Sequence, residues 1–193
     1  MMKDKGYNPE IFPANINEEL PFSLEMESAV MYLALKKALW VETQKMADLK
    51  SHTSETNQTD DIADSDAPII IAADTVVYKD KIIGKPESPD EAFNILSSLR
   101  NTWHYVVTGV CIIKAGTPLR KTFCEITKVF FKNYTDDELR DYVKTDEPYD
   151  KAGGYAIQGT FSKYIDHFEG DYDNVVGFPW SRIEMELLKL NEK

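Results

Sequence analysis

The sequence predicts an α/β domain with a mixed central sheet flanked by helices. Runs rich in β-branched and apolar residues, typical of core strands, alternate with segments whose apolar residues recur at helical spacing. Some of the strand-like runs follow one another directly, and others are separated by helices, which together favour a mixed sheet. With 193 residues, the chain is long enough for one domain with a sizeable core.

The first half of the chain contains a helix, a polar segment and a strand. Residues 23–43 are predicted to form an amphipathic helix, because apolar residues from Met26 to Val41 recur at helical spacing. Residues 44–67 are acidic and polar with few apolar anchors, so we expect a flexible loop insertion there. Within residues 69–77, an unbroken apolar run extends up to the acidic residue Asp74. This run predicts a strand buried on both faces.

The second half begins with a hairpin turn at 78–82 and a well-marked helix start. Ser88 is the expected N-cap, Pro89 occupies the first helical position, and Glu91 completes a capping box. The remaining elements are strands over 105–113 and 122–131, a helix from the Thr135–Glu138 capping box to about 144, a glycine-flanked strand or tight loop over 153–159, and a terminal helix from Pro179.

Composition limits the classes of partner. A net charge of -11 argues against nucleic-acid binding, which needs a basic stripe, but it permits a small phosphorylated ligand with a few local cations. No apolar segment approaches the roughly 20 residues that span a bilayer, and no signal peptide is recognisable, so we expect no membrane partner. Cys111 and Cys124 fit reduced core thiols, and we therefore expect a cytoplasmic protein.

Asp74 and Lys85 are the first candidates for chemistry. A carboxylate at the end of a core strand is costly unless it is paired, hydrogen-bonded or bound to a metal. Lys85 stands between Gly84 and Pro86, where a hairpin could return it toward the strand. Together they favour a metal-assisted phosphate site. The alternative is that Asp74 caps a turn and Lys85 is a solvated hairpin residue.

Three further residues have both a functional and a structural interpretation. Glu18 could supply a second carboxylate for a hard cation such as magnesium, or belong to a solvated acidic loop. Lys37 falls on the apolar side of the first helix, where it must meet an anion or extend toward solvent. Gln158 follows a glycine-rich run and can read the edge of a base, or be polar filler.

The chain resembles the Maf-like proteins, which are nucleoside triphosphate pyrophosphatases related in fold to the inosine triphosphate pyrophosphatases. The resemblance covers nearly all of residues 1–193 as a single Maf-like domain, apart from the acidic insertion at 44–67. The matching motifs occur in family order: 73–77, Gly84-Lys85-Pro86, His104 with Thr108-Gly109, Glu125 with Thr127, 147–159, 170–172 and 174–179.

The resemblance implies metal-dependent cleavage between the α and β phosphates of a nucleoside triphosphate, with Mg²⁺ or Mn²⁺, by a homodimer. The form of the motifs is most similar to the branch that prefers dTTP and UTP. Alternatives are a pyrophosphatase for 7-methyl-GTP or another modified nucleotide, and a catalytically weakened nucleotide-binding or cell-division regulatory protein. The implied roles are Asp74 as catalytic acid/base and metal ligand, Glu18 as metal ligand, Lys37 and Lys85 on phosphate, and Thr75 and Gln158 on the base.

One family feature has no match in this sequence. Family members begin with a buried strand and a Ser-x-Ser-Pro-Arg-Arg loop that binds phosphate, and residues 1–7 correspond to the end of the helix after that loop. We therefore expect an N-terminally truncated domain that lacks bidentate arginine contacts. Either the gene model begins at an internal methionine, or the protein itself is shortened.

Overall fold

The computed structural model describes residues 2–20, 24–53 and 67–191 of the chain. The contacts within the chain form two compact units. The first contains Met1–Asp74 and Gly109–Cys124, and the second contains Thr75–Thr108 and Glu125–Lys193.

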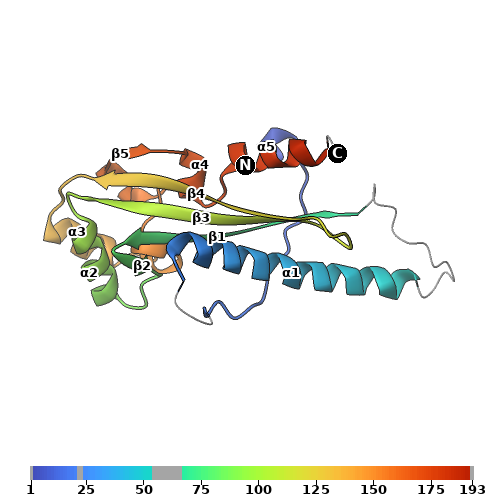
Figure 1. The fold of residues 1–193 in the computed structure, drawn as a ribbon. Coiled ribbons are helices and arrows are strands. Elements are labelled where there is room, and N and C mark those ends of the chain that lie inside the picture. The colour runs from blue at the N-terminus through green and yellow to red at the C-terminus, as the bar shows by residue number, and fades with distance from the viewer. Residues whose placement is uncertain (1, 21–23, 54–66, 192–193) are drawn as a thin grey trace. The chain divides into compact units, whose positions relative to one another are not determined.

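The described strands form one five-stranded sheet in the order β2-β1-β3-β4-β5 (Figure 1). The β1–β2 and β4–β5 pairs are antiparallel. The backbone N–H of Ala115 donates to the carbonyl of Pro68, and that of Lys114 donates to Leu119, as expected for antiparallel neighbours on both sides of β3. The strands are β1 (Ile69–Lys79), β2 (Lys81–Ile83), β3 (Trp103–Lys114), β4 (Arg120–Phe131) and β5 (Ile165–Glu169).

The α/β class is therefore confirmed, but the mixed sheet is wrong for the described strands. Tight turns at Asp80 and Gly116 join β1 to β2 and β3 to β4, and hairpins pair strands antiparallel. The hairpin predicted at 78–82 is confirmed by the β1–β2 pairing, whereas β5 was not predicted from the sequence.

The most buried strand is β3, not β1. Every residue from Val106 to Ile113 is buried. In β1, Ile69 is 44% exposed, and most of the strand is only half-buried, so the prediction of a strand buried on both faces was wrong. Because β2 pairs only with the last residues of β1, the earlier part of β1 has no described neighbour on that side.

In the first unit, helix α1 runs from Met26 to Thr53, well past the expected end at residue 43. Residues 44–53 of the predicted loop are therefore helical, since they include good helix formers such as Met46 and Ala47. Residues 54–66 of that predicted loop lie outside the described residues. The core of this unit contains Ala34, Ala38, Val41, Ile70, Cys111, Ile113 and Ala115.

In the second unit, both predicted helix starts are present. Ser88 caps α2 by accepting from the Glu91 N–H at 3.2 Å, but the Glu91 carboxylate accepts from the N–H of Glu87 instead of Ser88, so the expected capping box is only half formed. The Thr135–Glu138 capping box is complete. The helices are α2 (Pro89–Leu99), α3 (Asp136–Tyr142), α4 (Tyr172–Val176) and α5 (Trp180–Asn191), with 3₁₀ turns η3 (Glu147–Asp150), η4 (Ala152–Gly154) and η5 (Thr160–Tyr164); η1 (Lys3–Lys5) belongs to the first unit.

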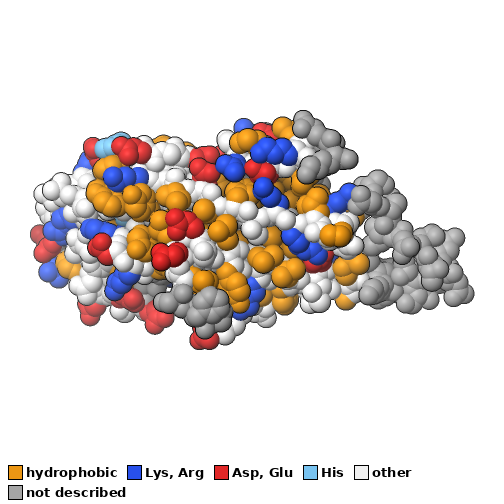
Figure 2. All heavy atoms as spheres, viewed as in Figure 1, with side chains coloured by type: hydrophobic (Ala, Val, Ile, Leu, Met, Phe, Trp, Pro, Cys, Tyr) orange, Lys and Arg blue, Asp and Glu red, His pale blue; other side chains and the backbone are white. Residues whose placement is uncertain are grey.

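The surface drawn in Figure 2 carries both signs of charge. Lys and Arg side chains are scattered among acidic and hydrophobic ones on this face. Within the described helices, none combines the length and the apolar character needed to cross a bilayer.

Candidate functional site

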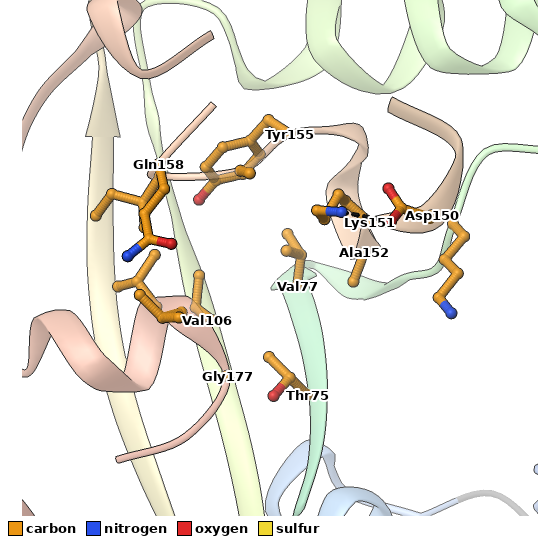
Figure 3. Close-up of a pocket in the computed structure, with 14 residues that line it drawn as sticks. Thr75, Val77, Val106, Asp150, Lys151, Ala152, Tyr155, Gln158 and Gly177 are labelled. Carbon is orange, nitrogen blue, oxygen red and sulfur yellow. Dashed lines mark hydrogen bonds and ion pairs between the residues drawn. The ribbon is translucent and has the colours of Figure 1, made fainter. Parts of the chain in front are cut away.

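The second unit contains a pocket of about 370 Å³, a size typical of small-molecule sites. Three residues predicted from the sequence, Thr75, Lys85 and Gln158, all line it. Figure 3 shows Thr75 and Val77 on β1, with the side chain of Gln158 extending from a separate loop. The other lining residues are Val106 on β3, residues 150–152 and 155–157, and Val175–Gly177 at the end of α4.

Glycines allow the pocket loop to lie directly against β1. Gly153 and Gly154 have φ values of 72° and 75°, in the left-handed region that favours glycine. A Cβ on Gly153 would lie 2.8 Å from a methyl carbon of Val77, so a larger residue would push the loop away. The Gly153 N–H also donates to the carbonyl of Gly84 at 2.9 Å, which ties the loop to the turn that carries Lys85.

The Glu147 carboxylate closes the base of this loop. Its Oε2 accepts from the backbone N–H of Thr160 at 3.1 Å and from the Thr160 hydroxyl at 2.7 Å. Its Oε1 accepts from the Tyr142 hydroxyl at 3.2 Å. Burial alone would raise the pKa of Glu147, but the hydrogen bonds from Thr160 and Tyr142 lower it overall. Glu147 thus stays ionised and joins the two ends of the segment that carries Gln158.

A buried histidine supports the pocket from behind. His104 Nε2 lies 2.6 Å from the hydroxyl of Tyr155, whose residue lines the pocket. His104 is fully buried, and burial, together with the charge of Lys79, lowers its pKa to about 3. The imidazole is therefore neutral at physiological pH, and its hydrogen bond holds the side chain of Tyr155 in place.

The first unit brings together the other predicted residues. Lys37 Nζ lies 2.6 Å from Asp74 Oδ1 and 2.8 Å from Glu18 Oε1. Asp74 is 9% exposed, whereas Glu18 reaches into solvent. Burial acts to lower the pKa of Lys37, but hydrogen bonds and charge attraction from Asp74 and Glu18 raise it above its ordinary value. The anions that Lys37 meets are therefore two carboxylates of the chain itself.

These residues also bear on the predicted metal. Among the described residues there is no cluster of three or more His, Cys, Asp or Glu side chains that could hold an ion. Glu18 and Asp74 nevertheless converge on one cationic group. Two carboxylates are what Mg²⁺ commonly takes from a protein when substrate phosphates and water complete its octahedral shell. The donor set thus fits a cation delivered together with a polyphosphate.

Sequence reasoning missed several pocket residues. Glu147 and Tyr155 fall within the recognised 147–159 motif, but only the folded loop shows which of its side chains are structural supports. The buried positions Thr108 and Asn174 also fall within recognised motifs and carried no predicted role. Alternation on β3 could have indicated that Val106 and Thr108 share a face.

Comparisons with known proteins match nearly the whole chain. A family model described as "Maf-like protein" matches residues 1–190. A protein of Caldicellulosiruptor bescii named dTTP/UTP pyrophosphatase is 39% identical over 191 residues, covering 98% of this chain and 88% of that protein. One of the same name from Bdellovibrio bacteriovorus is 32% identical over 98% of this chain and 91% of its own length. Another, from Thermosipho melanesiensis, is 50% identical over 60% of this chain and 63% of its own length.

Proposed function

The chain belongs to the Maf-like protein family, and from this premise we propose that it is a nucleotide pyrophosphatase that hydrolyses dTTP and UTP to the monophosphate and pyrophosphate. The observation that carries the proposal is the similarity, over 98% of this chain, to proteins named dTTP/UTP pyrophosphatase. Membership also supports an architecture like that of the inosine triphosphate pyrophosphatases. The homodimer and the cytoplasmic location stay predictions.

We assign the nucleoside to the pocket of the second unit. Its volume of about 370 Å³ suits a nucleoside, and its walls combine apolar residues with a few polar groups, as in most nucleotide sites. Gln158 can both donate and accept, which fits the edge of a pyrimidine. Lys85 supplies positive charge for a phosphate group in a chain whose net charge is -11.

We assign the hydrolysis step to Asp74, which directly precedes the pocket residue Thr75 in the chain. The cleaved linkage is the oxygen bridge between the α and β phosphorus atoms of the triphosphate. A water oxygen bonds to one of these two phosphorus atoms, and the bond from that phosphorus to the bridging oxygen breaks. The bond's electron pair leaves with the bridging oxygen, and the proton of the water passes to the Asp74 carboxylate. Lys37, 2.6 Å away, stabilises the charge of Asp74 and orients it.

Glu18 and Asp74 would hold the divalent cation. When bound, Mg²⁺ or Mn²⁺ supplies positive charge that offsets the phosphates during cleavage. Both carboxylates pair with Lys37, so their oxygens already lie around one positive charge, the ammonium group of that lysine.

The test is pyrophosphate release by the purified full chain from UTP, dTTP, CTP and 7-methyl-GTP, with Mg²⁺, with Mn²⁺ and with EDTA. We expect turnover of UTP and dTTP that requires a metal. The variant D74N should lose at least about a hundredfold in kcat. D141N, which changes an exposed aspartate on α3, should keep wild-type activity.

Other outcomes would redirect the proposal. A preference for 7-methyl-GTP would move the chain to the alternative substrate branch. Binding of UTP without turnover under either metal would support a non-catalytic nucleotide-binding protein. Wild-type rates in D74N would remove Asp74 from the chemistry.

A further inference from the structure

The hydroxyl of Thr75 is hydrogen-bonded to a second, fully buried hydroxyl. Thr75 lines the pocket, and its Oγ1 lies 2.9 Å from Oγ1 of Thr108 on β3. Thr108 has no exposed surface. On the distance alone either oxygen could be the donor, so the direction of this bond depends on the other contacts of Thr108.

A backbone carbonyl fixes that direction. Thr108 Oγ1 lies 3.2 Å from the carbonyl oxygen of Asn174, which has no hydrogen, so the Thr108 hydroxyl must be the donor there. A hydroxyl carries one proton. Thr108 therefore accepts from Thr75, and the proton of Thr75 points away from the pocket. What Thr75 retains for a ligand is a lone pair.

The carbonyl that orients Thr108 is itself held firmly. Asn174 is fully buried, and its Nδ2 donates to the carbonyl of Val106 at 3.0 Å and to Oγ1 of Thr127 at 2.9 Å. The Gly177 N–H donates to the Asn174 carbonyl at 2.9 Å. A network of this kind resists rotation of any one member, because each rotation would leave a buried polar atom unpaired.

The pocket wall also lies close to the Thr75 hydroxyl. Gly177 has a φ of 101°, and a Cβ built on it would lie 3.2 Å from Thr75 Oγ1. The backbone therefore comes close to this oxygen only because residue 177 is glycine. The available directions for a ligand group at Thr75 are correspondingly few.

We propose that Thr108 is a positioning residue that makes Thr75 a hydrogen-bond acceptor, and that the donor which Thr75 reads is the imide N3–H of uracil or thymine. This inference rests on the proposed function. Uracil and thymine carry a hydrogen at N3, whereas cytosine has a lone pair there, which would face the lone pair of Thr75. A sugar hydroxyl is a poorer candidate for this donor. The 2′-hydroxyl is missing from dTTP, and the 3′-hydroxyl is the same in every nucleotide, so a contact with it would not distinguish one base from another.

The first experiment compares UTP with CTP in the wild type and in T108V. Valine matches threonine in shape, and the Asn174 carbonyl keeps its bond from Gly177, so the variant chiefly releases the Thr75 proton. The kcat/KM ratio of UTP to CTP should fall by about tenfold, the worth of one hydrogen bond to a base edge. T108S, which keeps the hydroxyl, should restore the ratio. A purely structural defect would lower both rates alike and leave the ratio unchanged, which would overturn the proposal.

The second experiment identifies the donor on the substrate. UTP, 3-methyl-UTP and 3′-deoxy-UTP are compared in the wild type and in T75V, as two double-mutant cycles. N3 methylation should cost at least about tenfold more in the wild type than in T75V, because the added bulk is common to both. Coupling of T75V to the 3′-hydroxyl, and not to N3, would overturn the assignment to the base.

These results separate the inference from the proposed function. Failure of the wild type to release pyrophosphate from UTP or dTTP would refute the proposed function. Calorimetric binding of UMP, CMP and 3-methyl-UMP to the same protein would then decide the inference. Tighter binding of UMP than of both others, lost in T75V, supports it, whereas equal or no binding overturns it. Where T108V does not fold, the T75V cycles decide the outcome.

Discussion

Lys37 Nζ lies 2.6 Å from Asp74 Oδ1 and 2.8 Å from Glu18 Oε1, so one ammonium group joins two carboxylates distant in sequence. The pair with Asp74 is largely buried, and only Glu18 is well exposed. Breaking a buried pair by removing one partner leaves the other charge uncompensated. Lys37 therefore fixes the charge and position of Asp74 before any substrate is present.

Replacing this lysine should lower the rate of catalysis while leaving the protein folded. In K37M the Asp74 carboxylate loses the ammonium group that lies 2.6 Å from its Oδ1, and with it an orienting contact, so we expect kcat for UTP to fall by about a hundredfold. Thermal unfolding followed by circular dichroism should show a folded protein. The matched control is K45M, which removes a lysine from the same helix and the same kind of ion pair, with Glu10. Equal rates in the two variants would contradict the role of Lys37.

Glu147 is expected to act on substrate binding through the loop that it closes. E147A removes the acceptor for both Thr160 donors and for the Tyr142 hydroxyl, so the segment that carries Gln158 gains freedom. KM for UTP should rise by about tenfold, because the loop must be ordered again at each binding event. Steady-state kinetics on the purified chain provide the measurement.

The control for Glu147 is its sequence neighbour. Asp146 is exposed and makes no side-chain capping bond, so D146A should leave KM unchanged. A KM for E147A within twofold of the wild type would mean that the remaining contacts of the loop hold Gln158 by themselves.

The sequence identified the residues of the candidate site better than it identified the sheet. Lys85 and Gln158 were selected for their glycine and proline neighbours and Thr75 through the family resemblance, and all three line one pocket. Lys37 was singled out because its charge falls on an apolar helix face. That argument is local and left two alternatives open, an anion or an extension toward solvent; in the structure Lys37 pairs with the carboxylate of Asp74.

What the sequence could not supply depends on contacts between distant segments. The apolar run of β1 reads as a fully buried strand, but its exposure depends on β2 being short, which is a property of another segment. Helix α1 has little apolar periodicity beyond residue 43, so the sequence pattern predicted that the helix ends there. The direction of the Thr75–Thr108 bond depends on a carbonyl of Asn174, far along the chain.

His104 should make stability depend on pH. Its pKa in the folded protein is about 3, well below its ordinary 6.5, so the unfolded chain binds this proton more strongly. The contribution of His104 is therefore complete above about pH 6.5 and is lost as the pH falls toward 3, by up to about 1.4 kcal/mol per pH unit. Urea unfolding at pH 7 and at pH 5 measures this loss.

The variant H104F isolates the effect of this one group. It should be less stable than the wild type at pH 7, because the Tyr155 hydroxyl loses its partner, yet it should lose less stability on going to pH 5. H167A removes an exposed histidine and should keep the wild-type slope. Parallel losses in the wild type and H104F would show that other groups dominate acid unfolding.

Gly109 is expected to be the glycine of the first unit least tolerant of a methyl group. A Cβ built there would lie 2.3 Å from the backbone carbon of Val30 and 2.5 Å from the nitrogen of Met31, so helix α1 lies directly against β3 at this point. These are backbone atoms of a helix and cannot turn aside as a flexible side chain would. G109A should therefore destabilise the chain by about 3 kcal/mol, the upper range for overpacking. In G84A the added carbon meets no atom within 4 Å, so the urea midpoint should stay near that of the wild type. A midpoint for G109A equal to that of G84A would mean that α1 can move away from β3 at little cost.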